Sequence, residues 1–217
     1  MQKPARAQIC RPTWAAGRNC GSMMGEAIPS ARSGSARWAT MSARTEKVCK
    51  SWTARERSTR YRHGMPMEVI ETGIGIPNTL CWSPDRRQFY FGDTLKNEIR
   101  VYDYDIESGD IGSVRPFFAG FERGLPDGSA MDSDGYLWNC RYGGGCVVRV
   151  APDGGIDRVI DIPAGNVTTC TFGGPQLTTL YVTTAAADRA PDDRLAGSLF
   201  AIETGIRGMA ENSFSLG

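Results

Sequence analysis

The sequence lacks several features that define common enzyme and membrane classes. It has one histidine, His63, and no G-x-S-x-G segment, which excludes schemes built on two histidines and disfavours a Ser-His-Asp arrangement. None of the seven cysteines forms a C-x-x-C motif, and their odd number, without a secretory signal, predicts free thiols in the cytoplasm. No stretch approaches 18 apolar residues, so no membrane-spanning segment is expected.

Helical patterning is also missing, since no window of the last 150 residues has the spacing of an amphipathic helix. Apolar residues alternate instead over four to eight positions, between clusters of Asp, Gly, Pro and Ser. Four aspartates in these clusters are predicted turn formers: Asp85, Asp132, Asp134 and Asp153. The pattern predicts an all-β fold. Cys140 and Cys146 flank a predicted hairpin where they could approach each other, although free thiols are favoured there too.

An internal repeat organises these strands. An offset of 49 aligns PNTLCWSPDRRQFYF with PDGSAMDSDGYLWNC, carrying Asn78 onto Asp127 and Phe89 onto Trp138. A third copy at an offset of about 90 places Thr168 opposite Asn78. Repeats of this length made of short strands are typical of β-propellers, in which each blade is one four-stranded sheet. Aromatic residues recur at blade positions and are predicted to fill the core: Trp82, Phe89, Tyr90, Trp138, Phe172 and Tyr181.

Two oxygen-bearing side chains, Asn78 and Asp127, occupy the same register and are predicted to point to one place. Amide and carboxylate oxygens suit hard cations such as calcium or magnesium and tolerate manganese or zinc. Such a cation polarises a carbonyl group and lowers the pKa of a bound water. Asp127 is also the candidate general base, and hence the candidate catalytic residue.

The strands resemble the family of gluconolactonase, regucalcin (senescence marker protein) and the luciferin-regenerating enzyme. Five stretches between about Met65 and Gly217 carry the resemblance: IPNTLCWSPD; YFGDT with VYDYD; LPDGSAMDSDGYLWNCRYGGGCVVRVAPDG; TTCTFGGPQLTTLYVTTA; and GSLFAI to FSLG. It implies a six-bladed β-propeller that hydrolyses a sugar lactone with one divalent cation in its central channel. The implied metal ligands are Asn78, Asp127 and a glutamate of the first blade. This chain has Asn78-Thr79 where the family usually has Asn-Gly.

Other residues have two interpretations. Asp93 is a possible channel-facing residue by resemblance, or a structural residue at the end of a strand. Arg141 and Tyr142 either border the substrate mouth or are solvated loop residues, and the second interpretation is favoured. Glu26 lies only 52 residues before Asn78, where the family has well over a hundred, and is assigned no ligand role. No substrate-binding residue is identified.

The first 62 residues form a separate, atypical segment. They carry 13 Lys and Arg, three Glu and no Asp, whereas residues 63–217, the predicted propeller domain, carry 12 basic and 21 acidic residues. Within the segment, ARWATM and then SARTEK resemble a damaged copy of a family strand. An altered reading frame or a misjudged start is the favoured explanation, ahead of a divergent blade or a functional basic tail. We expect about four recognisable blades, hence an incomplete propeller, and neither nucleic acid nor membrane as partner.

Two function classes follow from the sequence. The first is a lactonase, that is, a carboxylic-ester hydrolase that uses a divalent metal to open a sugar lactone. The alternative is a noncatalytic calcium-binding or interaction propeller, or an inactive truncated member of the family, because propellers host many functions. Dependence of turnover on metal separates the two classes.

Overall fold

The computed structural model describes residues 8–9, 34–36, 56–60, 66–187 and 190–212, and the described part is almost entirely β-structure. One short 3-10 helix, η1 (Thr94–Lys96), is the only helix within those ranges. No helix in these ranges is long and apolar enough to cross a membrane. Eight strands lie between residues 77 and 161: β5 (Pro77–Trp82), β6 (Gln88–Asp93), β7 (Glu98–Tyr104), β8 (Ile111–Ala119), β9 (Leu125–Met131), β10 (Leu137–Tyr142), β11 (Cys146–Val150) and β12 (Ile156–Asp161).

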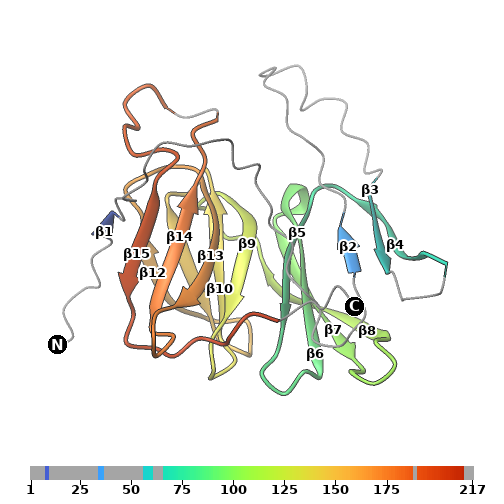
Figure 1. Ribbon diagram of the computed structural model, residues 1–217. Helices are drawn as coiled ribbons and strands as arrows, with labels where there is room; N and C mark the ends of the chain where they lie inside the picture. The colour runs from blue at the N-terminus through green and yellow to red at the C-terminus, as the bar shows by residue number, and fades with distance from the viewer. Residues whose placement is uncertain (1–7, 10–33, 37–55, 61–65, 188–189, 213–217) are drawn as a thin grey trace.

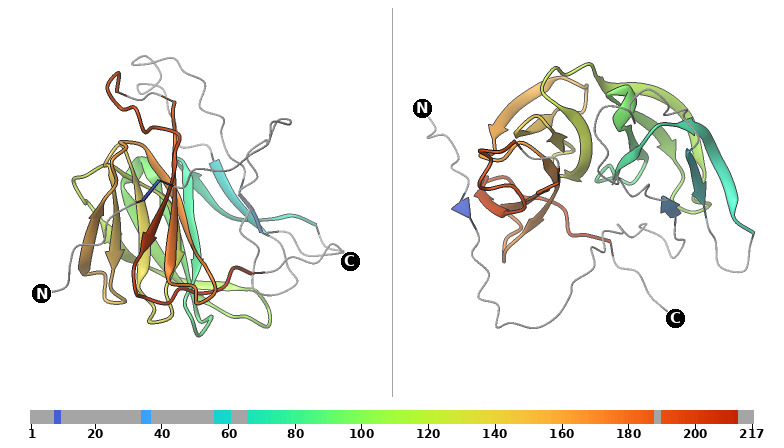
Figure 2. Two further views of the ribbon diagram at one scale, coloured as in Figure 1. Left: turned by 60° about the vertical axis from the view of Figure 1, so that its left-hand side comes forward. Right: turned by 90° about the horizontal axis from the view of Figure 1, so that it is seen from above.

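The strands form four antiparallel sheets that follow one another around an arc (Figures 1 and 2). Strands β5 to β8 and β9 to β12 each form a sheet in sequence order. The third sheet contains β13 (Val167–Gly173), β14 (Thr179–Thr184) and β15 (Leu199–Glu203), and its fourth strand is β1 (Gln8–Ile9). The remaining sheet is β2 (Gly34–Ala36), β3 (Glu56–Arg60) and β4 (Glu68–Ile74). Four blade-like sheets agree with the number expected, although the described part of one has three strands.

Strands from the basic segment take part in two of these sheets. Strand β1 pairs with β15 at the far end of the chain, and β2 and β3 pair with each other and then with β4. Sheet pairing therefore crosses the boundary after residue 62. Glu26, His63 and most of the ARWATM strand lie outside the described residues.

The turns form as the sequence predicts. The Asp85 carboxylate accepts hydrogen bonds from the Ser83 hydroxyl, at 2.6 Å, and from the Arg87 N–H, at 3.1 Å. Asp132 and Asp153 accept backbone N–H groups two residues further along in the same way. Asp132 has a second role, since its other oxygen accepts from Trp138 Nε1 and pairs with Arg149 at 2.7 Å. Short polar side chains thus fix the turns by bonding to their own backbone.

The core lies between the sheets, where aromatic residues pack together with aliphatic residues and cysteines. Trp82 and Phe89 pack with ring centroids 5.0 Å apart, and Trp138 meets Phe172 edge-on at 5.5 Å. Five of the six aromatic residues predicted for the core are buried there. Tyr181 is the exception and is half-buried, because it lies on the opposite face of β14 from the buried Leu180 and Val182.

One part of the repeat alignment is wrong by one residue. The turn after β5 is closed by a hydrogen bond from Ser83 to Gln88, whereas the turn after β9 is closed from Asp132 to Tyr136 and is one residue shorter. The offset of 49 therefore holds along β5 and β9, but it becomes 48 after the turn. Tyr90, and not Phe89, is the counterpart of Trp138.

The four described cysteines in these sheets are buried thiols rather than disulfides, as predicted. Cys140 and Cys146 belong to a hairpin in which Arg141 pairs with Cys146, but their side chains enter different core clusters. The thiol beside Cys140 is Cys170, on β13 of the next sheet. Burial and this neighbour raise the pKa of the Cys140 thiol. The two thiols that approach each other thus belong to different blades.

Candidate metal centre at the start of the inner strands

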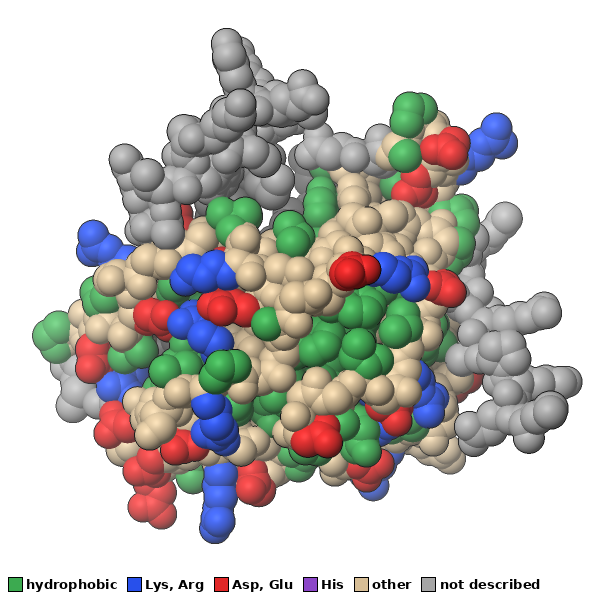
Figure 3. All heavy atoms as spheres, turned by 180° about the vertical axis from the view of Figure 1, so that it is seen from behind, with side chains coloured by type: hydrophobic (Ala, Val, Ile, Leu, Met, Phe, Trp, Pro, Cys, Tyr) green, Lys and Arg blue, Asp and Glu red, His purple; other side chains and the backbone are tan. Residues whose placement is uncertain are grey.

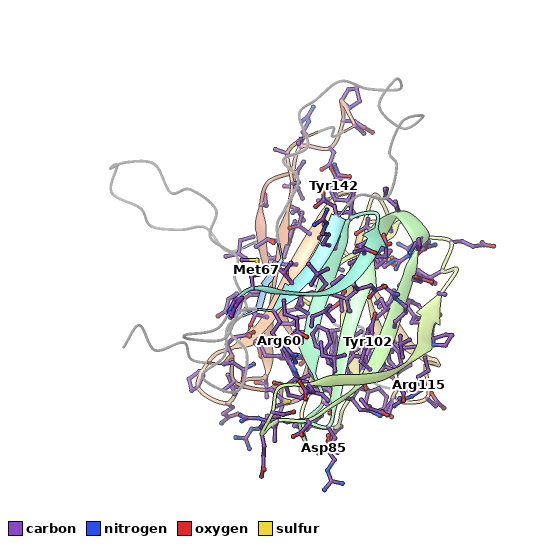
Figure 4. The ribbon with its side chains drawn as sticks, turned by 90° about the vertical axis from the view of Figure 1, so that its right-hand side faces the viewer. Arg60, Met67, Asp85, Tyr102, Arg115 and Tyr142 are labelled. Carbon is purple, nitrogen blue, oxygen red and sulfur yellow. The ribbon has the colours of Figure 1, made fainter. Side chains whose placement is uncertain are left out.

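The candidate site lies where the inner strands begin. Strands β5, β9 and β13 are the first strands of three consecutive sheets, and β9 packs between the other two. Tyr142 pairs with Leu125 at the start of β9 and lies at one end of the molecule, whereas Asp85 lies at the opposite end (Figure 4). Asn78 and Asp127 are therefore at the end marked by Tyr142.

Each inner strand is irregular at this level. Register shifts interrupt the pairing of β5 between Asn78 and Leu80, and that of β13 between Val167 and Thr169. In β9 the pairing is interrupted at Asp127 and Gly128, between Pro126 and Ser129. A bulge bends the strand and redirects the side chain beside it, which suits a functional position. The same irregularity thus accompanies the repeat register in three sheets.

Thr79 forms the bulge in β5 with a backbone that side-chain-bearing residues rarely adopt. Its φ angle is +50°, in the left-handed region, where a β-branched residue is strained. This angle gives a physical reason for glycine at this position in the resembling family. Gly128, at the same level in β9, is required for another reason. A Cβ atom there would lie 2.2 Å from the Thr169 hydroxyl oxygen.

Asn78 is 5% exposed, and its amide group is only partly satisfied. The amide nitrogen donates a hydrogen bond of 3.0 Å to the Thr94 hydroxyl oxygen. The amide oxygen, Oδ1, is buried and has no hydrogen-bond partner. A buried acceptor without a donor costs free energy, so its presence indicates a missing partner.

Asp127 lies beside that amide. Burial raises the pKa of its carboxyl group to about 7, although hydrogen bonds from the Gly128 N–H and the Asn78 side chain favour the charged form. The structure therefore brings together the two side chains that share a repeat register. It also gives the carboxyl group a pKa close to neutrality, a property concentrated at functional sites.

These residues fit a divalent cation. The unpartnered oxygen of Asn78 and the carboxylate of Asp127 provide two oxygen ligands of the type that calcium, magnesium and manganese accept. Within the described ranges, no group of three His, Cys, Asp or Glu side chains gathers at one point. The described protein ligands thus number two, and water or a residue outside these ranges would complete the coordination.

Asp93 has contacts that define a structural role. Its buried carboxylate accepts hydrogen bonds from the N–H groups of Gly75, at 2.9 Å, and Ile76 and Leu95, each at 3.2 Å. Lys96 lies 3.3 Å away as an ion-pair partner. These bonds join the end of β6 to the chain before β5 and begin helix η1. Of the two interpretations of Asp93, the contacts favour the structural one.

A buried polar network lies beneath the site. The Thr79 hydroxyl donates to the backbone carbonyl of Asp127, at 2.8 Å, and lies 2.9 Å from the Ser129 hydroxyl. Asn139 donates to the Ser129 hydroxyl at 2.9 Å, and its own oxygen accepts from Arg141 at 3.1 Å. Sequence reasoning missed this network because single Thr, Ser and Asn residues in strands give no pattern.

Arg141 corrects the expectation of a solvated loop residue, because it is 1% exposed. It is the last residue but one of β10, whose residues from Leu137 to Arg141 are all buried. Its guanidinium group donates to five neutral oxygens: Asn139 Oδ1, Asn97 Oδ1 and the carbonyls of Arg123, Phe121 and Gly124. No carboxylate is among these partners, and burial lowers its pKa to about 10.

Consecutive four-stranded sheets around an arc, with candidate ligands at the start of the inner strands, define a β-propeller protein. The sequence model of the SMP-30/Gluconolactonase/LRE-like region matches residues 29–186. The chain therefore belongs to this family. The match begins inside the basic segment, earlier than the resemblance recognised in the sequence.

Individual relatives agree with this assignment. A pentonolactonase of Haloferax volcanii is 39% identical over 153 residues, which are 66% of this chain and 52% of the relative. Human regucalcin is 34% identical over 149 residues, or 65% of this chain and 50% of regucalcin. The crystal structure of a calcium-binding protein, regucalcin, from Agrobacterium tumefaciens superposes with a TM-score of 0.70 at 30% identity, covering 77% of this chain and 58% of that one. The chain spans about half the length of the curated relatives it matches.

Proposed function

We propose that this chain carries the metal-binding and catalytic side of a sugar lactonase site. The observation that carries the proposal is the buried, unpartnered oxygen of Asn78 beside the Asp127 carboxyl group. The similarity to a pentonolactonase supports a lactone as the substrate class. The similarity to a calcium-binding regucalcin supports a divalent cation. Resupplying calcium, zinc, manganese or magnesium in turn identifies the metal that supports turnover.

Asn78 and Asp127 would hold the cation. When bound, a divalent cation supplies Lewis acidity to a lactone carbonyl and makes water more acidic. Asn78 contributes a neutral oxygen and Asp127 a negative charge, so the pair compensates only part of the charge of the ion. The remaining positive charge favours an electron-rich carbonyl oxygen as a further ligand.

Asp127 is the proposed general base. In its ionised form it accepts a proton from the attacking water while the oxygen of that water bonds to the lactone carbonyl carbon. The ring carbon–oxygen bond then breaks, and the proton passes to the ring oxygen, giving a hydroxy acid. Burial raises the pKa of this carboxyl group to about 7, and a bound cation would favour the ionised form that a base requires.

The four buried thiols in the described sheets support a reducing compartment, and we propose the cytoplasm on that basis. On the face seen from behind, acidic and basic side chains are interspersed (Figure 3). A patch of one sign, the usual footprint of a nucleic-acid partner, is not seen on that face.

Hydrolysis of gluconolactone tests the proposal. Metal-stripped protein is resupplied with calcium, zinc, manganese or magnesium, and acid release is followed. We expect activity that returns with metal, is abolished in Asp127→Ala and is strongly reduced in Asn78→Ala. Asp153→Ala, a turn residue in another part of the sheet, is the matched control and should retain activity. Metal binding without turnover in folded protein would favour the alternative, a noncatalytic calcium-binding propeller.

A further inference from the structure

Thr94 occupies a position between the two strands that carry the candidate ligands. It follows Asp93 at the end of β6, in the first turn of η1, and is 8% exposed. Its hydroxyl oxygen receives the hydrogen bond from the Asn78 amide nitrogen at 3.0 Å. The same hydroxyl donates to the carbonyl oxygen of Pro126 at 2.7 Å, directly before Asp127. One hydroxyl group therefore connects β5 with β9.

The direction of these bonds is fixed by chemistry. A carbonyl oxygen can only accept, so the single hydroxyl proton of Thr94 is used by Pro126. Towards Asn78, the Thr94 oxygen can then act only as an acceptor.

The contact with Thr94 thus requires the nitrogen of the Asn78 amide. The amide oxygen is left on the side of the amide group that faces away from Thr94. This explains why Asn78 Oδ1 is buried and without a partner. An amide that flipped by 180° would place its oxygen against the Thr94 oxygen, where two acceptors repel.

We propose that Thr94 is the positioning residue of the metal site. It holds the Asn78 amide in the one orientation that presents oxygen to a cation. It also fixes the spacing between β5 and β9 through Pro126. This proposal rests on the proposed function, because it assigns a role to Thr94 only if Asn78 and Asp127 bind a cation. Groups that orient a metal ligand typically change metal affinity by about 10- to 100-fold when they are removed.

Two substitutions of Thr94 and a matched control at another threonine distinguish this role from a general packing role. Thr94→Val keeps the shape of the side chain and removes the hydroxyl, whereas Thr94→Ser keeps the hydroxyl. Thr184→Val is the control, because Thr184 is also 8% exposed and its hydroxyl also joins an N–H donor, Gly197 at 3.1 Å, to a carbonyl, Ser198 at 2.8 Å. The control loses the same two bonds at a distance from Asn78.

The dissociation constant for manganese and for calcium is measured by calorimetry on the whole chain and its variants. We expect about 10- to 100-fold weaker binding for Thr94→Val, near wild-type binding for Thr94→Ser, and unchanged binding for Thr184→Val. Lactone turnover by Thr94→Val should recover at saturating metal, which a merely misfolded site would not allow. Equal affinity of wild type and Thr94→Val, or equal losses in Thr94→Val and Thr184→Val, would overturn the assignment.

A second measurement does not depend on metal. In the proton–nitrogen NMR spectrum of the metal-free protein, the Asn78 side-chain amide signals should shift in Thr94→Val and return in Thr94→Ser. If wild type binds no metal while these shifts occur, the proposed function fails and the orienting contact stands. If the signals do not shift, Thr94 does not orient Asn78, whatever the metal result.

Discussion

The Thr79 hydroxyl donates a 2.8 Å hydrogen bond to the main-chain carbonyl of Asp127, which lies at the neighbouring repeat position on the next sheet. Thr79 makes this bond from a left-handed backbone conformation, with φ at +50°. The two residues link the bulges of β5 and β9, one through its hydroxyl group and the other through its carbonyl. Backbone strain in one sheet is thus accompanied by a bond that holds the candidate site of the next.

At Thr79, the usual order of stability of alanine and glycine variants should be reversed, with the glycine variant the more stable. Thr79→Ala loses the hydroxyl bonds and retains the strain, whereas Thr79→Gly loses the same bonds and relieves the strain. We expect the glycine variant to be more stable than the alanine variant by about 1 kcal/mol in urea unfolding. At Thr171, a strand residue without a positive φ, alanine should be the more stable replacement. The same order at both positions would contradict the strain at Thr79.

Asp127→Asn should stabilise the metal-free protein at alkaline pH. The pKa of this carboxyl group rises from 3.8 in the unfolded chain to about 7 in the fold. Between these values the unfolded chain ionises while the folded protein keeps its proton, so ionisation favours unfolding as the pH rises. Asparagine removes this effect, and we expect a gain of about 4 kcal/mol at pH 8 that disappears near pH 4.

Unfolding of wild type and Asp127→Asn in urea at pH 4, 6 and 8, with chelator present, measures this gain. Asp85→Asn is the control, and its effect on stability should have the opposite pH dependence. The pKa of Asp85 is lowered by the Ser83 hydroxyl and the Arg87 N–H, so its stabilising contribution is present above its unfolded pKa and is lost as the pH falls. A gain in Asp127→Asn that did not vary with pH would show that burial does not perturb this carboxyl group.

Arg141→Met should be strongly destabilising. The substitution leaves five oxygens without their donor, four of them on Asn97, Arg123, Phe121 and Gly124 and one on Asn139. Buried acceptors without partners are costly, and we expect a loss of about 3 kcal/mol in urea unfolding. Arg115→Met removes an exposed ion pair with Asp103 and should change stability by less than about 0.5 kcal/mol. Similar effects of the two substitutions would refute the buried network.

The sequence predicted the β-propeller architecture and the proximity of Asn78 and Asp127 for one physical reason. Equivalent positions of a repeat lie at the same height on adjacent sheets, so a shared register becomes a shared location. The same argument failed for Phe89 and Trp138, because a turn with one extra residue changes the offset without disturbing the strand before it. Turn length is decided by local bonds that an alignment by offset does not contain.

Burial of Arg141 and the role of Thr94 were beyond sequence reasoning. An arginine at the end of a strand is ordinarily exposed, and here five neutral oxygens from separate loops and strands replace water. Thr94 acts through hydrogen bonds with Asn78 and Pro126, which are 16 and 32 residues away in the sequence. Contacts of this kind depend on how sheets pack, which hydrophobic patterning does not specify.

The most direct test of the account is a count of manganese ions bound by the metal-stripped chain, made by electron paramagnetic resonance at increasing manganese concentration. The account predicts one saturable site in wild type and in the turn variant Asp153→Ala. It predicts loss of that site in Asp127→Asn, and much weaker binding in Asn78→Ala. A wild-type site that persists unchanged in both ligand variants would show that Asn78 and Asp127 do not form the metal centre.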